Sequence, residues 1–466
     1  MKIRFEGAAQ TVTGSQTVVT HNGESILIDC GLYQGPKPLR LLNWEQPAYL
    51  NDIKAIVLTH AHIDHSGLVP RWSSWGWKGP IFCTLSTADL LSIMLLDSAR
   101  LQAEDARFAN ETRYSLHDPA LPLYTERDAE AALKLLYRLP FDQWQTLSPT
   151  MSFRFLRAGH ILGSAMVQIS YANTNHSKII TFSGDLGGGH SELIKEPTNI
   201  LETDELIIES TYGDRKVNAQ GREERLAEII NKVIGRKGTL VIPAFALGRT
   251  QDLLLSIYRL RQNKHIPEVP VYLDSPMAKA VTKVYLQNLN ELIYDPVDKH
   301  IEKSLSPNFF HAVESPDDSM LLCMSDEPKI VLSASGMLQG GRVLHHLKLK
   351  LPSEKNGILF VGFQGKGTKG RLLQEGISSI RMHHQEIQVE AEIFTLDGYS
   401  AHADSDDLLR WVKAFTKKPT RIFLNHGEIE SQTVFAAKIK SELNINAEIP
   451  ILHQEYDLGT GPKVSF

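Results

Sequence analysis

One six-residue stretch concentrates four side chains that can bind a metal ion. It contains His60, His62, Asp64 and His65 in the pattern H-x-H-x-D-H, directly after the apolar run 53–58. Imidazole nitrogens and carboxylate oxygens are the ligands that zinc takes in catalytic sites that also hold water. Four such groups are too many for one ion with an open position, so the spacing favours two metals completed by more distant ligands. A chance histidine-rich loop is the weaker alternative, with only 18 His in 466 residues.

Further acidic and histidine residues follow short apolar runs that are typical of strands. Polar groups at strand ends meet at one edge of a sheet, where a rigid scaffold holds them together. Taken singly, each is a commonplace polar residue at the end of a strand. Taken together, they predict one site, and its residues beyond the first stretch are His160, Asp185, Glu209, His402 and His426.

The first stretch, continued by Ser66-Gly67-Leu68, resembles the signature of the metallo-β-lactamase superfamily. Glu209, the segment 400–404 (Ser-Ala-His-Ala-Asp) and His426 resemble three further motifs of the nucleic-acid-processing β-CASP branch. The resemblance covers essentially the whole chain. It implies an α/β protein with a four-layer αββα fold, into which a parallel-sheet α/β domain is inserted.

The resemblance also implies two Zn²⁺ per chain and a role for each site residue. Two metals about 3.5–4 Å apart can activate water and stabilise the charge that develops during phosphodiester hydrolysis. His402 would protonate the leaving 3′ oxygen, and Glu209 would orient and charge that imidazole. The implied metal ligands are His60, His62 and His160 for the first ion, Asp64, His65 and His426 for the second, and Asp185 for both, with Asp64 also counted as catalytic.

Strand-like and helix-like runs alternate from about residue 239 to residue 373, which predicts a parallel α/β unit. Because His402 and His426 come after it, we expect this unit to interrupt the metal-binding domain. The expected limits are 1–212 and 391–466 for the two parts of the metal-binding domain, and 213–390 for the insertion.

Small and basic residues in the insertion predict contacts with phosphate. The segment 365–371 follows a strand and opens a helix, where backbone N–H groups favour anions. It also matches G-x-G-x-x-G, but a lone match outside a first βα unit makes a dinucleotide site a weak alternative. The candidate substrate-binding residues are Arg249, Ser333, Ser335, Gly336, Lys366, Lys369 and Arg371, each of which could instead be an ordinary loop or surface residue.

Composition limits the class of protein. Hydrophobic residues make up 42% of the chain and charged residues 22%, which is ordinary for a globular protein. No apolar run is long enough for a membrane span or a signal segment, so we expect no membrane partner. Three widely spaced cysteines, Cys30, Cys83 and Cys323, predict packing residues in a reducing cytoplasm. The net charge of −5 does not favour nucleic acid, so RNA binding requires a local basic groove.

Local patterns predict several elements around the site. Asn22-Gly23 between two strand-like runs predicts a hairpin, and Asp29 at its end is expected to orient the histidine loop. A helix is expected over 86–111, and a second one, capped at Thr125, over 129–139. The segment 70–77 carries three of the six tryptophans and is expected to cover the loop beside the site.

These observations together predict a ribonuclease that cuts single-stranded RNA internally, leaving 5′-phosphate and 3′-hydroxyl ends. A 5′–3′ exoribonuclease is the nearest alternative, and the lack of an extra C-terminal domain favours the endonuclease. A small-molecule ester or thioester hydrolase shares the metals but does not explain the insertion, Glu209 or His402. An RNA-binding scaffold without catalysis is disfavoured because every ligand position is filled. The resemblance further implies a homodimer.

Overall fold

The computed structural model describes residues 1–113, 115, 117–172, 177–297, 299–338, 340–362, 364–365, 368–382 and 385–459. The chain forms two compact units. The first comprises Met1–Gly189, Glu196–Lys216 and His402–Phe466, and the second comprises His190–Lys195 and Val217–Ala401. The main segment of the second unit, Val217–Ala401, therefore lies between two segments of the first in the sequence.

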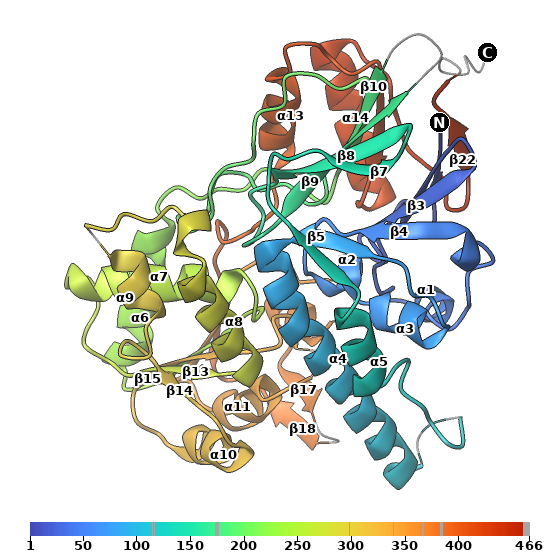
Figure 1. The fold of residues 1–466 in the computed structure, drawn as a ribbon. Coiled ribbons are helices and arrows are strands. Elements are labelled where there is room, and N and C mark those ends of the chain that lie inside the picture. Colours follow the sequence, from blue (N-terminus) through green and yellow to red (C-terminus); the bar gives the residue numbers. More distant parts are fainter. Residues whose placement is uncertain are drawn as a thin grey trace. The chain divides into compact units, whose positions relative to one another are not determined.

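Two sheets form the centre of the first unit (Figure 1). Within the described residues, one sheet has the order β22 (Glu455–Asp457), β1 (Lys2–Phe5), β2 (Thr17–His21), β3 (Glu24–Ile28), β4 (Ile53–Val57), β5 (Ile81–Thr84), β6 (Leu136–Leu139). The other, over the same residues, has the order β21 (Ala447–Glu448), β20 (Arg421–Asn425), β11 (Glu205–Glu209), β10 (Ser177–Phe182), β9 (Ala165–Ala172), β8 (Met151–Arg157), β7 (Gln145–Ser148).

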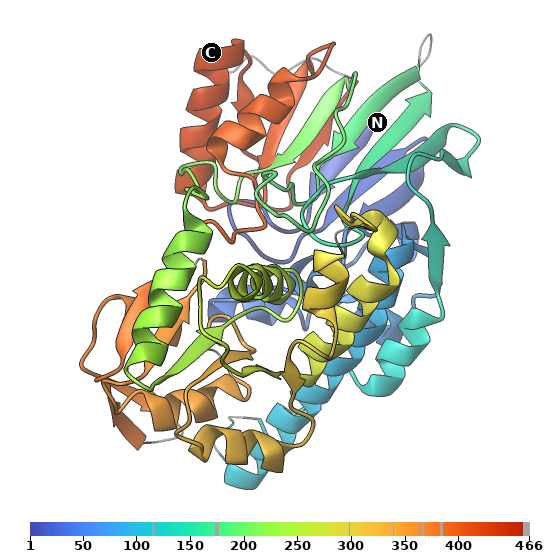
Figure 2. The same ribbon diagram turned by 90° about the vertical axis from the view of Figure 1, so that its left-hand side faces the viewer.

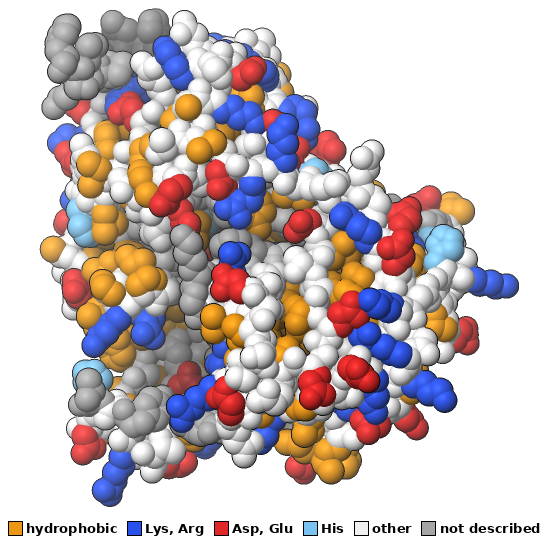
Figure 3. Space-filling view, turned by 180° about the vertical axis from the view of Figure 1, so that it is seen from behind, with side chains coloured by type: hydrophobic (Ala, Val, Ile, Leu, Met, Phe, Trp, Pro, Cys, Tyr) orange, Lys and Arg blue, Asp and Glu red, His pale blue; other side chains and the backbone are white. Residues whose placement is uncertain are grey.

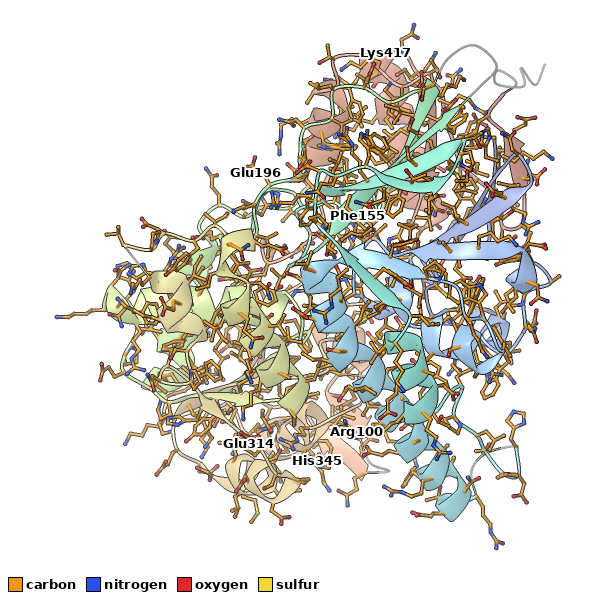
Figure 4. All side chains as sticks on the ribbon, viewed as in Figure 1. Arg100, Phe155, Glu196, Glu314, His345 and Lys417 are labelled. Atoms are coloured by element: carbon orange, nitrogen blue, oxygen red, sulfur yellow. The ribbon has the colours of Figure 1, made fainter. Side chains whose placement is uncertain are left out.

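Apolar side chains from both sheets form a shared core. Phe5 of β1, Val57 of β4 and Phe155 of β8 are almost completely buried there, and Phe155 is labelled in Figure 4. Large apolar side chains supply most of the free energy that favours burial, so this core joins the sheets face to face. A second core joins the β20 sheet to α13 (Ser405–Lys413) and α14 (Ile429–Leu443).

Helices also follow the strands of the first sheet, which completes the four layers. They are α1 (Lys37–Leu42), α2 (Ile63–Ser66), α3 (Val69–Ser74), α4 (Leu85–Thr112) and α5 (Glu126–Leu133), with a 3₁₀ turn at Leu50–Asp52. The expected αββα arrangement is confirmed. None of the described helices is long and apolar enough to cross a membrane.

Local sequence explains several of these boundaries. β2 and β3 pair in the expected hairpin, because Asn22 (φ 49°) and Gly23 (φ 81°) supply the two positive φ angles of a type I′ turn. Thr125 and Asp128 form the expected capping box of α5. The expected helix over 129–139 is wrong in its second half. α5 ends at Leu133, and residues 136–139 instead pair with β5 as β6.

The second unit contains a parallel sheet whose strands alternate with helices along the chain (Figure 2). Among the described residues, its order is β14 (His311–Ala312), β13 (Val271–Asp274), β15 (Lys329–Ser333), β12 (Thr239–Pro243), β16 (Gly357–Phe360), β19 (Glu392–Thr395). A separate hairpin pairs β17 (Ser379–Met382) with β18 (Gln385–Gln388). Its helices are α6 (Arg222–Gly235), α7 (Arg249–Gln262), α8 (Pro276–Gln287), α9 (His300–Leu305), α10 (Pro316–Met324), α11 (Val343–Lys350) and α12 (Lys369–Gln374), with a 3₁₀ turn at Leu289–Glu291.

The expected parallel α/β insertion is confirmed by this sheet. β19 pairs with β16 and belongs to the second unit, so the expected start of the second part of the metal-binding domain at residue 391 is wrong. The apolar pattern of a strand does not reveal which sheet it joins. The other predicted domain limits stay predictions.

Candidate metal centre

The histidine-rich stretch lies where β4 ends and α2 begins. His60 and His62 are in the connecting loop, and Asp64 and His65 are on the single turn of α2. Nε2 of His60 lies 3.0 Å from Nδ1 of His62, so the two rings face a common point.

Three more ligand candidates come from the strands of the other sheet. His160 follows β8, Asp185 follows β10, and His426 follows β20. Nε2 of His160 lies 3.2 Å from Nδ1 of His62, and Nε2 of His426 lies 3.1 Å from Nε2 of His65. Donor atoms within 4.8 Å of one another form two principal groups, which are His60, His62, His160 and Asp185, and Asp64, His65 and His426.

Asp185 lies between these two groups and faces each with a different oxygen. Its Oδ2 is 3.6 Å from Nε2 of both His60 and His160. Its Oδ1 is 3.3 Å from Nε2 of His65 and 3.5 Å from Nδ1 of His426. The side chain is almost completely buried, and Oδ1 accepts no hydrogen bond of normal geometry within the described residues. A buried carboxylate in this position needs positive charge nearby, which a pair of cations supplies.

Electrostatics favour the metal-binding form of two imidazoles in the first group and of both carboxylates. Burial lowers the pKa of His60 and lowers that of His62 to about 4, so both imidazoles keep a nitrogen lone pair for a metal. Burial opposes the charge of Asp64, but hydrogen bonding with His426 outweighs it and lowers the pKa of that carboxyl. Burial likewise opposes the charge of Asp185, but His426 and His65 hold its pKa well below the usual range. Neutral imidazoles and ionised carboxylates are the forms that coordinate metal.

A supporting layer fixes the imidazoles from behind. Asp29, which the sequence indicated, accepts a hydrogen bond from Nδ1 of His65 at 2.7 Å and one from the Thr59 backbone N–H at 2.8 Å. Metal-binding histidines usually donate their second ring N–H in this way. Sequence reasoning missed Thr59 and Thr211, whose hydroxyls lie 3.0 Å from Nδ1 of His60 and 3.2 Å from Nδ1 of His426. The available signal was their position in the sequence, because Thr59 directly precedes His60 and Thr211 lies two residues after Glu209.

His402 and Glu209 form a pair at the edge of the two groups. Nδ1 of His402 lies 3.1 and 3.2 Å from the two carboxylate oxygens of Glu209, which ends β11. The Leu186 backbone N–H donates to Oε1 of Glu209 at 2.6 Å and fixes the carboxylate. His402 does not cap α13, because Asp404 accepts from the first backbone N–H groups of that helix.

His402 differs from the ligand candidates in exposure and charge. Its side chain is 19% exposed, whereas Glu209 is almost completely buried. Burial lowers the pKa of His402, but Glu209 and Asp185 outweigh this and raise it to about 9. The histidine therefore holds a proton on a side chain that reaches the surface of the site.

The candidate substrate-binding residues lie in the second unit. The Ser333 hydroxyl is buried and donates to the Asp274 backbone carbonyl at 3.0 Å. Ser335 is partly exposed, and the buried Gly336 accepts from Nε2 of Gln364 at 2.9 Å.

The basic candidates have different surroundings. The Arg249 guanidinium lies 5.0 Å from the Phe245 ring centroid. Lys369 begins α12, and Arg371 is exposed and pairs with Glu375 at 2.7 Å. Lys366 lies outside the described residues. On the face in Figure 3, cationic and anionic side chains are interspersed, which agrees with the modest net charge.

Three known protein families match successive parts of the chain. The metallo-β-lactamase superfamily matches residues 10–204, and the Beta-Casp domain matches residues 250–373. The Zn-dependent metallo-hydrolase RNA specificity domain matches residues 386–450. The first and third matches include the candidate metal ligands, since His60 to Asp185 lie in one and His426 lies in the other.

Proteins of bacteria and archaea are similar over nearly the whole chain. A ribonuclease of Thermus thermophilus is 33% identical over 435 residues, which are 92% of this chain and 94% of the relative. An RNase J-like protein of Methanocaldococcus jannaschii is 32% identical over 96% of this chain and 98% of its own. The transcription termination factor FttA of the same organism is 29% identical over 97% of this chain and 70% of its own.

A solved structure has a similar fold. It is that of a protein of unknown function from Enterococcus faecalis V583, with a TM-score of 0.53 at 13% identity, over 98% of this chain and 99% of the other. This likeness concerns the fold alone.

Proposed function

Because this chain belongs to the β-CASP branch of the metallo-β-lactamase superfamily and is a metal-dependent RNA hydrolase, we propose that it is a two-zinc endoribonuclease. It cuts single-stranded RNA and leaves 5′-phosphate and 3′-hydroxyl ends. The observation that carries the proposal is the position of Asp185, whose two oxygens face two separate groups of ligands. One carboxylate placed in this way can be shared by two ions.

Each ligand group has the composition that zinc requires. His60, His62 and His160 would hold one ion, while Asp64, His65 and His426 would hold the other. Two bound Zn²⁺ would supply a water of near-neutral pKa and positive charge for the phosphoryl oxygens. Asp29 and the two threonines keep the imidazoles oriented, so the protein supplies a preformed site.

The His402–Glu209 pair supplies the proton that the leaving 3′ oxygen needs. Glu209 holds the Nδ1 side of the ring, so the proton assigned to the leaving group is the one on Nε2. A positioned acid of this kind contributes about 10²–10⁴-fold to the rate. A small-molecule thioester hydrolase has no comparable need for an acid, because thiolates leave without protonation.

The second unit supplies contacts with the RNA backbone. Arg249, Lys369 and Arg371 carry positive charge on partly exposed or exposed side chains, and Ser335 and Gly336 offer a small-residue turn. Such local contacts are necessary because the chain carries a net charge of −5. Lys366 belongs to the segment 365–371, to which we assign phosphate binding. Ser333 supports the turn that contains Ser335 and Gly336.

Two further parts of the proposal concern the cellular compartment and the oligomeric state. Cys30, Cys83 and Cys323 are all buried and unpaired, which supports a reducing cytoplasm. Light scattering across a concentration series tests the expected homodimer. The mass of a monomer at every concentration would contradict it.

Metal content is the first test of the proposal. Elemental analysis of purified protein should give about two Zn²⁺ per chain. Asp185→Asn should reduce the content at both positions, whereas His60→Ala should chiefly reduce one. His453→Ala serves as a matched control, because His453 pairs with Glu6 away from the ligand groups and is 60% exposed. Full activity in metal-free protein would refute the mechanism.

A substrate without ends distinguishes an endonuclease from an exonuclease. An endonuclease should linearise a circular single-stranded RNA, whereas a 5′–3′ exonuclease should leave it intact. The new ends should be sensitive to an exonuclease that requires a 5′-phosphate. Linearisation that yields a 2′,3′-cyclic phosphate would contradict the proposed attack by water.

A further inference from the structure

A cation lies between two indole rings on the partly exposed side of α3. The Arg71 guanidinium carbon is 5.3 Å from the ring centroid of Trp44 and 4.9 Å from that of Trp75. Nη1 of Arg71 also donates to the Leu123 carbonyl at 2.7 Å, which fixes the guanidinium. We call Trp44, Arg71 and Trp75 the tryptophan platform.

The tryptophan platform is not part of the core. The neighbouring Trp72 is completely buried and fills the core beneath α3, whereas Trp44 is 45% exposed and Trp75 is partly exposed. α1, which leads to Trp44, has no buried residue, and its Leu41 is 48% exposed. Single exposed apolar residues are common. Two solvent-accessible indoles beside a fixed guanidinium form a specific arrangement outside the core.

The tryptophan platform is joined to the loop that carries the metal ligands. Arg71 lies six residues after His65, on α3, which begins three residues after the end of α2. The segment before α1 is tied to the same loop, because the Leu32 N–H donates to the Ile63 carbonyl at 2.9 Å. Figure 1 shows α1, α2 and α3 in the same blue region of the first unit.

Asn43 fixes the end of α1 in turn. Its side chain is buried and exchanges two hydrogen bonds with the Tyr33 backbone, at 2.9 and 2.8 Å. Trp44 follows directly, so its backbone has little freedom to move away from Arg71. Both sides of the platform are therefore held in place relative to the metal-binding loop.

We propose that the tryptophan platform stacks unpaired bases of single-stranded RNA beside the scissile phosphate. This inference rests on the proposed function. Indole faces bind bases of any sequence, and nearby cations attract the phosphates between them. Lys37 and Arg40 on α1 are exposed and supply such cations next to the platform. RNA that passes the metal ligands would be held at this point by stacking, which needs no basic surface over the whole protein.

A binding measurement tests the platform directly. The His402→Ala background should keep the RNA intact while a labelled single-stranded oligonucleotide is titrated with zinc-loaded protein and followed by fluorescence anisotropy. Trp44→Ala and Trp75→Ala should each raise Kd by about 5- to 30-fold, in the range of one lost stacking contact. Trp44→Phe should restore most of the affinity, because a phenyl ring retains a stacking face.

Trp144 provides a matched control within the same unit. It is 41% exposed and has Arg154 4.7 Å from its ring centroid, so it has the same chemistry on another surface. Trp144→Ala should leave Kd within about twofold of the parent. RNA should also quench part of the tryptophan fluorescence, and that part should disappear in Trp44→Ala but not in Trp144→Ala. Thermal unfolding of each variant verifies that it is folded.

The outcomes separate this inference from the proposed function. Cleavage of RNA by the wild type with unchanged Kd in Trp44→Ala and Trp75→Ala would overturn the platform alone. Weaker binding in these variants with a wild type that cleaves no RNA would overturn the proposed function alone. If RNA neither binds nor quenches the wild type, the platform is also refuted. If Trp44→Ala instead abolishes self-association and leaves Kd unchanged, this face is an interface between copies, which refutes the platform as well.

Discussion

Replacement of His402 by alanine tests the assigned acid most directly. His402 is absent from the two ligand groups around Asp185, and its Nδ1 lies 3.9 Å from Asp185 Oδ2. The change should therefore leave about two Zn²⁺ per chain and nearly normal affinity for RNA. What it removes is the one protonated side chain that Glu209 holds at the edge of the site.

The size of the effect follows from what the proton contributes. Before metal binds, Glu209 and Asp185 raise the pKa of His402 to about 9. Cations on Asp185 would cancel much of its contribution and bring the group nearer to neutral pH, where an acid is most effective. Loss of a positioned acid lowers the rate by about 10²–10⁴-fold, which is about 2.7–5.4 kcal/mol of activation free energy.

Single-turnover cleavage of a defined RNA measures this loss of rate. A second substrate tests whether the loss arises from protonation of the leaving group. A phosphorothiolate with sulfur at the scissile 3′ position has a leaving group that departs without protonation. His402→Ala should therefore cleave it at nearly the wild-type rate. His453→Ala, which removes another histidine from a carboxylate pair, should behave as wild type on both substrates. Loss of zinc, or an equal defect on both substrates, would refute the assignment of His402 as the acid.

Three further changes test the residues around the site and in the second unit. Glu209→Gln should reproduce part of the His402→Ala defect, about 10- to 100-fold in single-turnover rate, and should shrink likewise on the sulfur substrate. Asp29→Ala should weaken zinc affinity by about 10- to 100-fold in a chelator competition, because His65 loses its 2.7 Å partner, whereas a change at the exposed Asp52 should not. Asp274→Ala should lower the free energy of unfolding by about 3–5 kcal/mol in denaturant titrations, because Arg342 and His346 lose a fully buried carboxylate; the exposed Asp326 is the control. Burial raises the pKa of Asp274, but hydrogen bonds from His346 and Ser319 outweigh it and lower the folded-state pKa, so this stabilisation is present above the unfolded pKa and is lost as pH falls toward the folded one. An acid limb of stability that is unchanged in Asp274→Ala would contradict that reasoning.

The ligand types were predictable because metal affinity is a property of the side chain. His60, His62, Asp64 and His65 lie within six residues, so no knowledge of the fold is needed to see them as one group. The hairpin turn at Asn22-Gly23 and the capping box at Thr125 were predictable for a similar reason. In each case, the interacting groups are within a few residues of one another, where chain geometry permits few alternatives.

Elements whose state depends on distant partners were predicted less well. Residues 136–139 carry a helical pattern after α5 but form β6, because β5 offers a strand edge with which they pair. β19 joins the sheet of the second unit by pairing with β16. Its residue pattern alone would equally suit a strand of the first unit. The Ser333 hydroxyl, which looked available from its small-residue turn, is bonded to the Asp274 carbonyl.

The sequence by itself determined which residues could hold metal, where an α/β unit interrupts them, and the family. Only the tertiary structure decided the geometry behind the roles that the resemblance implied. Each oxygen of Asp185 faces a different ligand group, and a carboxylate oxygen of Glu209 lies 3.1 Å from Nδ1 of His402, 193 positions away. The tertiary structure likewise brought Trp44 to Arg71 and Trp75 on the surface. Local propensity fixes conformation over a few residues, but contacts between distant residues form only when the two sheets bury their apolar faces against each other.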